Sequence, residues 1–119
     1  MGSSRHLGRV IVLKTLFAHE FNGGDPEGML EYIAQEFEGK ISDLSFAYAL
    51  LNGVLHHQKE IEELIVKNAP QWPIDKIARI DRVLLEIGVY ELIFPGDVPE
   101  VVAIDEAIEL AKTFGNENS

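Results

Sequence analysis

Residues that could perform catalysis or bind a metal are few in this sequence of 119 residues. His56 and Glu60 stand one helical turn apart and could both reach one metal ion, but two ligands without a third or fourth make a poor site. No glycine-flanked serine or Ser-x-x-Lys motif provides an activated nucleophile, and Gly23-Gly24 lacks the Lys-Ser/Thr pair of a phosphate-binding loop. Because the chain has no cysteine, disulfides, zinc thiolates and thiol nucleophiles are excluded. The sequence therefore predicts a protein that is not an enzyme and that uses no cofactor or metal.

Basic residues gather at the start of the chain. Arg5, Arg9 and Lys14 all precede the first acidic residue, Glu20. The chain has 20 acidic and 10 basic residues, a formal charge of −10, so the part from Glu20 onward has 10 − 3 = 7 basic residues against 20 acidic ones, or −13. As a total, this charge argues against a nucleic-acid binder, since phosphates repel an acidic surface. Two interpretations of the split stay open: a chance fluctuation in a short window, and a basic N-terminal helix on an acidic body.

The composition is that of a folded protein of one domain. Hydrophobic residues make up 46% of the chain and charged residues 25%, and a chain of this length can bury a core without disulfides or metals. The apolar run at residues 10–13 is too short for a signal peptide, and the longest apolar region, residues 83–94, is interrupted by Glu86 and Glu91. We therefore expect a single domain over residues 1–119, no membrane segment and a cytoplasmic location.

The spacing of apolar residues is helical along almost the whole chain, and no long stretch alternates with the period of two that strands require. Asn22-Gly23-Gly24 is typical of a helix end, and Asp25-Pro26 of the next helix start. The sequence predicts an all-α bundle of five or six helices over residues 4–21, 26–39, 43–68 (capped by Ser42 or Asp43, with a kink at His56-His57), 73–94 and 100–115. The apolar stripe of the first helix is expected to consist of Leu7, Val10, Leu13, Phe17 and Phe21, widened by Ile11 and Leu16.

Three stretches of the sequence are distinctive. The longest is VPEVVAIDEAIELAKTFG at residues 98–115, the second is IDRVLLEIGVYEL at residues 80–92 after Trp72-Pro73, and the third is SRHLGR at residues 4–9, followed by Leu16-Phe17. Together they resemble the NusB transcription antitermination family over nearly the whole chain. The resemblance implies two three-helix bundles packed crosswise and a role without catalysis. It also implies that the protein pairs with NusE, a ribosomal protein, and holds the boxA element of single-stranded nascent RNA within the transcription elongation complex, notably for ribosomal RNA.

The same resemblance implies an RNA-binding surface. Arg5 and Arg9, four residues apart, share one helix face and suit phosphate contacts, and Lys14 is expected to extend that side. Phe17 stands where the family usually has a Tyr that can stack on a base, but it also fits the apolar stripe, so a core role stays open. The implied RNA-binding residues are Arg5, His6, Arg9, Lys14, Phe17, Asn118 and Ser119.

A surface for the protein partner is implied as well. Asp81 matches an acidic position that the family directs at NusE, and Asp75 is a second candidate. The alternative for Asp81 is a solvated helix acid paired with Lys76 or Arg82. NusE is basic, so the acidic body of this chain would complement it. With about three cations, the salt slope for single-stranded RNA would be only about 2, at about 0.7 per phosphate, so we expect weak RNA binding without NusE.

The sequence also departs from the family. Glu86 stands where relatives commonly carry Arg, a reversal that the sequence does not explain. The family continues past the place of Ser119 with a further helix, without which apolar surface near Leu84, Ile108 and Phe114 would be uncovered. Two explanations stay open: a truncated chain, and a homodimer that covers this surface. Two other functions stay open: the RNA-recruiting domain of a ribosomal RNA cytosine methyltransferase, and a helical protein-interaction module without RNA binding.

Overall fold

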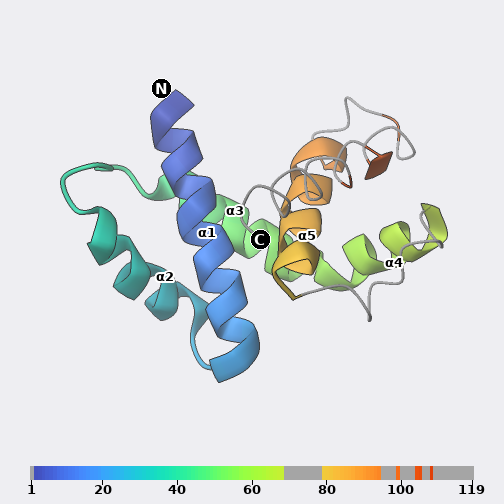
Figure 1. The fold of residues 1–119 in the computed structure, drawn as a ribbon, viewed down its shortest axis with the longest axis horizontal. Coiled ribbons are helices and arrows are strands. Elements are labelled where there is room, and N and C mark those ends of the chain that lie inside the picture. The colour runs from blue at the N-terminus through green and yellow to red at the C-terminus, as the bar shows by residue number, and fades with distance from the viewer. Residues whose placement is uncertain (1, 69–78, 95–98, 100–103, 106–107, 109–119) are drawn as a thin grey trace. The chain divides into compact units, whose positions relative to one another are not determined.

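The computed structural model describes residues 2–68, 79–94, 99, 104–105 and 108 (Figure 1). Every element in this part of the chain is helical, and no strand occurs in it, so the predicted all-helical fold is confirmed. The chain divides into two compact units, Met1–Leu55 (unit 1) and His56–Ser119 (unit 2). The helices are α1 (Gly2–Asn22), α2 (Pro26–Ala34), the 3-10 helix η1 (Gln35–Phe37), α3 (Ser45–His56), α4 (Gln58–Asn68) and α5 (Arg79–Ile93).

The turn between α1 and α2 forms as the sequence predicts. Gly23 and Gly24 both have positive φ angles, 65° and 85°, and the Gly23 N–H donates to the His19 carbonyl over 2.8 Å. Glycine adopts this left-handed conformation without the steric cost that a side chain brings. Asp25 then caps α2, because its Oδ1 accepts a hydrogen bond from the Glu27 N–H over 3.2 Å. The second predicted helix is shorter than expected, since the α-helix ends at Ala34 and continues only as η1.

The long third helix of the prediction is two helices. Of the two candidate caps, Asp43 accepts a hydrogen bond from the Ser45 N–H over 2.9 Å at the start of α3. This bond, together with the Ser45 hydroxyl, lowers the pKa of the Asp43 carboxyl. At the other end, α3 stops at His56, His57 forms a turn, and α4 begins at Gln58. The predicted kink is therefore a full break, at the boundary between units 1 and 2.

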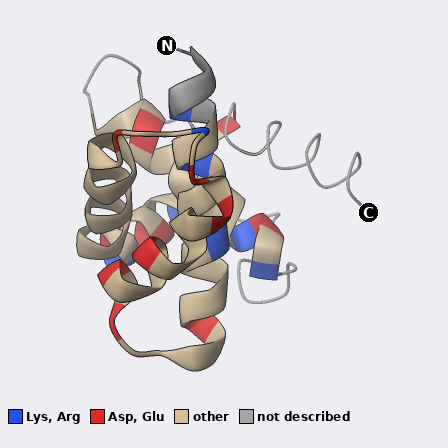
Figure 2. Cartoon of the chain, turned by 90° about the vertical axis from the view of Figure 1, so that its left-hand side faces the viewer, with Lys and Arg blue, Asp and Glu red and all other residues tan. Residues whose placement is uncertain are grey.

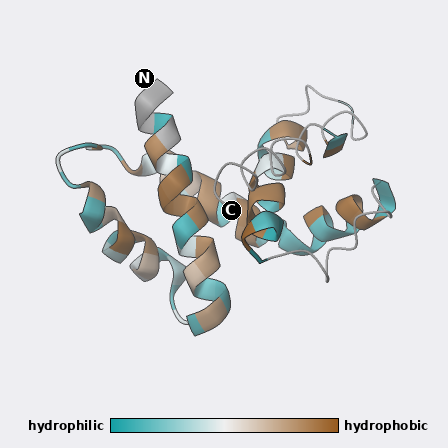
Figure 3. Cartoon of the chain, viewed as in Figure 1, coloured by the Kyte–Doolittle hydropathy of each residue, from teal (hydrophilic) through white to brown (hydrophobic). Residues whose placement is uncertain are grey.

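Unit 1 has a core built from α1, α2 and α3. Apolar and polar stretches alternate along these helices (Figure 3). The predicted stripe of α1 is wrong in part, because Leu7, Val10 and Phe17 are only half-buried and Phe21 is 62% exposed. Phe21 follows the buried Val12 by nine residues, or about two and a half turns, and so lies on the opposite side of α1. The buried apolar side chains of unit 1 are Ile11, Val12, Leu13, Leu16, Leu30, Ile33, Ala34, Ala47, Leu50, Leu51 and Val54.

Unit 2 has its own apolar cluster. Its buried members come from α4, α5 and the helical residues 104–105 and 108. The predicted helix over residues 73–94 is present as α5 from Arg79, while residues 73–78 and most of the predicted last helix lie outside the described residues. No helix in the described part of the chain is both long enough and apolar enough to span a membrane. The cluster consists of Ile61, Ile65, Leu85, Val89, Ile104 and Ile108.

Candidate nucleic-acid interface

Arg5 and Arg9 converge on one aromatic ring. The guanidinium carbon of Arg5 lies 4.8 Å from the centroid of the Phe46 ring, and that of Arg9 lies 5.3 Å from it. The two arginines are one turn apart on α1, whereas Phe46 is the second residue of α3. The prediction that Arg5 and Arg9 share a helix face is therefore confirmed, and the structure adds Phe46, which sequence reasoning missed.

Gly8 makes this arrangement possible. A Cβ atom built on Gly8 would lie 2.8 Å from Cδ2 of Phe46, closer than real Cβ atoms approach another atom. Because Gly8 carries no side chain, the Phe46 ring packs directly against the α1 backbone between the two arginines. The spacing Arg-x-x-Gly-Arg at residues 5–9 thus provides two cations and, at the glycine, the space into which the Phe46 ring packs.

The chemistry of this cluster suits an anion. A cation above an aromatic ring is attracted by the negative charge density of the ring face. Guanidinium N–H groups project from the edge of the planar group, so contact through its face leaves donors for phosphate oxygens. Arg5 is exposed and Arg9 is half-buried. The first turn of α1 contains no acidic residue. Figure 2 marks the Lys and Arg residues of the described chain in blue and its Asp and Glu residues in red.

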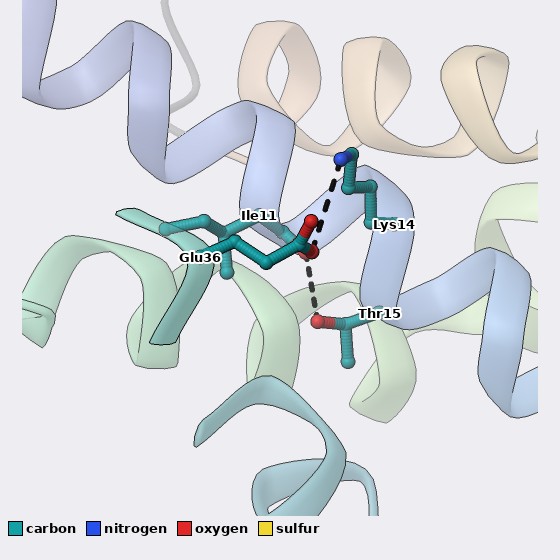
Figure 4. A network of polar contacts seen from close by, with 4 residues as sticks. All are labelled: Ile11, Lys14, Thr15 and Glu36. Atoms are coloured by element: carbon teal, nitrogen blue, oxygen red, sulfur yellow. Dashed lines mark hydrogen bonds and ion pairs between the residues drawn. The ribbon is translucent and has the colours of Figure 1, made fainter. Parts of the chain in front are cut away.

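Lys14 does not extend the Arg5–Arg9 side of α1. Its Nζ lies 3.9 Å from Oε1 of Glu36 (Figure 4). The same Nζ lies 5.4 Å from the centroid of the Phe37 ring, and both Glu36 and Phe37 belong to η1. The expectation of one continuous side is therefore wrong, because Lys14 follows Arg9 by five residues and points about 140° further round the helix. The next residue, Thr15, is buried and turned inward, and its hydroxyl donates to the Ile11 carbonyl over 2.7 Å.

Phe17 is neither fully exposed, as a base-stacking ring would be, nor fully buried, as a core residue would be. It is half-buried, and its ring meets that of Phe21 edge to face, with centroids 5.2 Å apart and planes at 72°. The exposed Phe21 at the end of α1 is a second surface aromatic that sequence reasoning placed in the core. The angular position of Phe21 on the helix relative to Val12 and Ile11 was the signal that could have found it.

The acidic side chains of α2 are held by α3 rather than turned toward the arginine pair. Asn52 Nδ2 donates to Glu27 over 2.9 Å, and the Tyr48 hydroxyl donates to the Glu31 carboxylate. That hydrogen bond, together with partial desolvation and the nearby negative charges, raises the pKa of Tyr48 to about 12. These acids therefore serve to join two helices of unit 1.

Asp81, the predicted partner-binding residue in unit 2, is half-buried near the start of α5. Its Oδ1 is shielded from solvent and accepts no hydrogen bond from any residue that the structure describes. Asp75, Asn118 and Ser119 lie outside the described residues, and His6 belongs to α1 with its side chain outside them. The predicted surfaces for RNA and partner therefore stay predictions at these four residues.

Glu86, whose place in the family is commonly held by Arg, is fully buried in α5. Its Oε1 accepts a hydrogen bond from Gln58 Nε2 over 3.1 Å. Burial and a hydrogen bond with the Glu62 carboxyl raise the pKa of Glu86 to about 8, although Gln58 and Arg82 act in the opposite direction. Two ionised carboxylates offer only acceptors, so a proton on Glu86 supplies the donor between them. The carboxyl is thus accommodated mainly in its neutral form at pH 7.

Glu60 pairs with His57 rather than with His56, although His56 stands one helical turn before it in the sequence. Nδ1 of His57, rather than His56, lies 3.4 Å from Oε1 of Glu60. The His57 ring also packs against Phe94 in a tilted arrangement, with centroids 4.3 Å apart and planes at 36°, and meets His56 edge to face. Among the described residues, no three His, Asp or Glu side chains are grouped so that they could hold a metal ion.

Comparison with known proteins identifies the family. The sequence pattern of the NusB family matches residues 6–119. The transcription antitermination protein NusB of Geobacter sulfurreducens is 40% identical over 117 residues (98% of this chain and 85% of that protein). The proteins of the same name from Dehalococcoides mccartyi (strain CBDB1) and Myxococcus xanthus are 36% and 38% identical, over 100% and 98% of this chain and 83% and 86% of theirs. A chain in a structure described as "Crystal Structure of a Plectonemic RNA Supercoil" matches 93% of this chain and 81% of its own length, with a TM-score of 0.70 and 26% identity. This chain belongs to the NusB family.

Proposed function

We propose that this protein is a transcription antitermination factor that binds boxA-type single-stranded RNA together with the ribosomal protein NusE. In this role it acts in the transcription elongation complex during synthesis of ribosomal RNA. Its relatives are named transcription antitermination proteins, and the description of the similar solved structure names an RNA. The observation that carries the RNA part is the pair of arginines held over Phe46 in a stretch of α1 that has no acidic residue.

The RNA contacts follow from the chemistry of this cluster. Arg5 and Arg9 bind neighbouring phosphates through their guanidinium edges, and Phe17 offers a half-exposed ring to a base. Lys14 adds a cation from another side of α1, where Glu36 already offsets part of its charge. His6, Asn118 and Ser119 complete the proposed RNA-binding residues. Few cations are involved, so the RNA affinity of the chain alone is weak and NusE supplies further positive charge.

The partner contacts rest on charge in unit 2. Asp81 keeps part of its side chain at the surface near the start of α5 and is proposed as a contact for a cationic group of a basic partner. Asp75 is proposed as a second contact. The chain from Glu20 onward carries a formal charge of −13, which attracts a basic protein and speeds association.

The RNA part is tested by fluorescence anisotropy with a labelled boxA-type RNA, purified NusE and the full chain, over a range of salt concentrations. We expect tighter binding to this RNA than to a scrambled RNA of the same composition. Replacing both Arg5 and Arg9 by Ala should lower the salt slope by about 1.4, since each phosphate contact contributes about 0.7. The matched control is Lys59→Ala with Lys67→Ala, which removes two exposed charges from α4 of unit 2 and should leave the slope unchanged.

The partner part is tested by calorimetric titration of the chain with NusE. Asp81→Asn should weaken this binding about tenfold, because it removes a charged acceptor of the partner cation. Asp105→Asn changes an exposed acid of unit 2 and serves as the control.

Binding of NusE without any preference for boxA-type RNA would contradict the RNA part and identify a protein-interaction module. RNA binding that does not respond to NusE would instead favour the RNA-recruiting domain of a methyltransferase.

A further inference from the structure

We infer that Phe46 is a positioning residue for RNA: its ring holds Arg5 and Arg9 so that both guanidinium groups meet phosphates together. This inference rests on the proposed RNA binding and adds a residue outside α1 to it. The centroid of the Phe46 ring lies 4.8 Å from the guanidinium carbon of Arg5 and 5.3 Å from that of Arg9. One ring of α3 therefore contacts both of the cations assigned to phosphate.

The Phe46 ring restricts the side chains of Arg5 and Arg9 before RNA binds. An arginine side chain on a helix surface samples many rotamers, and binding a phosphate immobilises it at an entropic cost. A guanidinium that already rests on a ring loses less freedom when phosphate binds. Two like charges one turn apart also repel each other, and the negative ring face offsets that repulsion. Phe46 thus preorganises the guanidinium groups of Arg5 and Arg9 for phosphate binding.

The Phe46 ring is itself held in place by its surroundings. The Phe46 ring packs against the α1 backbone, since Cδ2 and Cε2 lie 2.8 Å and 3.4 Å from the position that a Gly8 Cβ would occupy. The neighbouring residue Ala47 is fully buried and fixes the start of α3 in the core of unit 1. The ring is therefore anchored from both its own helix and α1. A platform fixed in this way can define the spacing of the two guanidinium groups.

The role of Phe46 differs from that of a ring that stacks on a base. The Phe46 ring is half-buried and is already in contact with two cations and the α1 backbone. The rings of Phe17 and Phe21, both in α1, meet edge to face, and Phe17 is the ring proposed to stack on a base. Phe46 therefore acts on RNA through Arg5 and Arg9, and its contribution disappears when they are removed.

The test is a double-mutant cycle measured by anisotropy with boxA-type RNA and saturating NusE. Phe46→Leu keeps an apolar side chain but removes the ring, and we expect about 5- to 10-fold weaker RNA binding and a lower salt slope. In the background with Arg5→Ala and Arg9→Ala, the same change should have no further effect. Phe46→Tyr keeps the ring and should restore binding. Tyr32→Leu, which removes an exposed ring of α2 in the same unit, is the matched control and should bind as the unchanged protein does.

Three further measurements separate the outcomes. The Nε–Hε signals of Arg5 and Arg9 in NMR spectra should shift in the Phe46→Leu variant without RNA, while its circular dichroism and NusE affinity stay unchanged. A Phe46→Leu effect of equal size in both backgrounds would overturn the inference, because the ring would then act independently of the arginines. If the unchanged protein shows no preference for boxA-type RNA, the proposed function fails. If Arg5 and Arg9 matter and Phe46 does not, only this inference fails.

Discussion

Units 1 and 2 differ in the surroundings of their distinctive charged side chains. In unit 1, the guanidinium groups of Arg5 and Arg9 remain at least partly accessible and rest on the face of Phe46. In unit 2, the carboxyl group of Glu86 is fully buried, and its pKa is raised to about 8. The first arrangement keeps charge available for an external anion, whereas the second removes charge from the molecule near pH 7.

The physical difference is the cost of dehydration. A cation over an aromatic ring gains electrostatic attraction while its edges remain hydrated. A buried carboxylate loses its water and needs hydrogen-bond donors in exchange, and Gln58 supplies one to Glu86. The formal charge of −10 counts Glu86 and Arg5 alike. Only their surroundings tell which of them can meet a ligand.

The largest expected effect comes from Glu86→Gln. In the folded protein the pKa of Glu86 is about 8, against an ordinary value of 4.5, so the folded state binds more protons than the unfolded state between these pH values. Stability contributed by the protonated acid is therefore fully present below pH 4.5 and is lost as the pH rises to about 8. Gln resembles the neutral acid, keeps an acceptor for Gln58 and can donate to Glu62. Urea denaturation at pH 8.5 should show a gain on the order of 3 kcal/mol in the free energy of unfolding.

At pH 4.5 the same substitution should have little effect, because Glu86 is then protonated. Glu63→Gln, which changes an exposed acid of α4, is the control for the loss of one charge. A gain of equal size at both pH values would show that burial does not hold the carboxyl neutral, and the contrast between the two units would no longer stand.

A smaller effect is expected from Gln58→Ala, which removes the donor to Oε1 of Glu86. Loss of a hydrogen bond to a buried acceptor should lower the free energy of unfolding by about 1–2 kcal/mol. Because the Gln58 amide lowers the pKa of Glu86, its removal should raise that pKa further. The loss should therefore be larger at pH 9 than at pH 6, as measured by urea denaturation. Asn68→Ala removes a side-chain bond to the Leu64 carbonyl in the same helix and should show no such pH dependence.

Local signals in the sequence were sufficient for much of unit 1. The cap of α2 at Asp25 and the turn at Gly23-Gly24 depend on residues within a few positions of each other, and both form as predicted. The face shared by Arg5 and Arg9 follows from helical spacing alone. What failed locally was the position of Phe21 on the helix, since a list of apolar residues at roughly helical spacing drifted away from the buried side.

The remainder depends on contacts between distant residues. Phe46 meets Arg5 across 41 positions of sequence, and Glu86 meets Gln58 across 28, and neither pairing has a local signature. The break at His57 likewise reflects the division into two units rather than a helix-breaking residue, because neither proline nor glycine stands there. The reversal at Glu86 could be noticed in the sequence, but its neutral state requires the burial that the fold provides.

The close packing of the Phe46 ring against Gly8 can be tested by Gly8→Ala. Gly8→Ala would favour the helix by about 1 kcal/mol on propensity alone. The new Cβ, however, would lie 2.8 Å from the ring and would force the ring to move. We therefore expect no gain in thermal stability and an RNA affinity reduced about as much as in Phe46→Leu. Ala18→Gly, at a half-buried position of the same helix, is the control for the propensity change. A stabilised variant with unchanged RNA affinity would show that the close packing is unnecessary.

The smallest effect is expected for Lys14→Gln, which compares the two cationic sides of α1. The ion pair with Glu36 is long, at 3.9 Å, and both side chains are about half exposed or more, so water and salt screen it. The free energy of unfolding should fall by less than about 0.5 kcal/mol. Glu36 already neutralises part of the charge of Lys14, and Lys14 lies on another side of α1 from the Phe46 ring that Arg5 and Arg9 contact, so Lys14→Gln should lower the RNA salt slope by less than Arg5→Ala. A drop as large as that caused by Arg5→Ala would mean that RNA displaces Glu36 from Lys14 and that the phosphate path runs along both sides of α1.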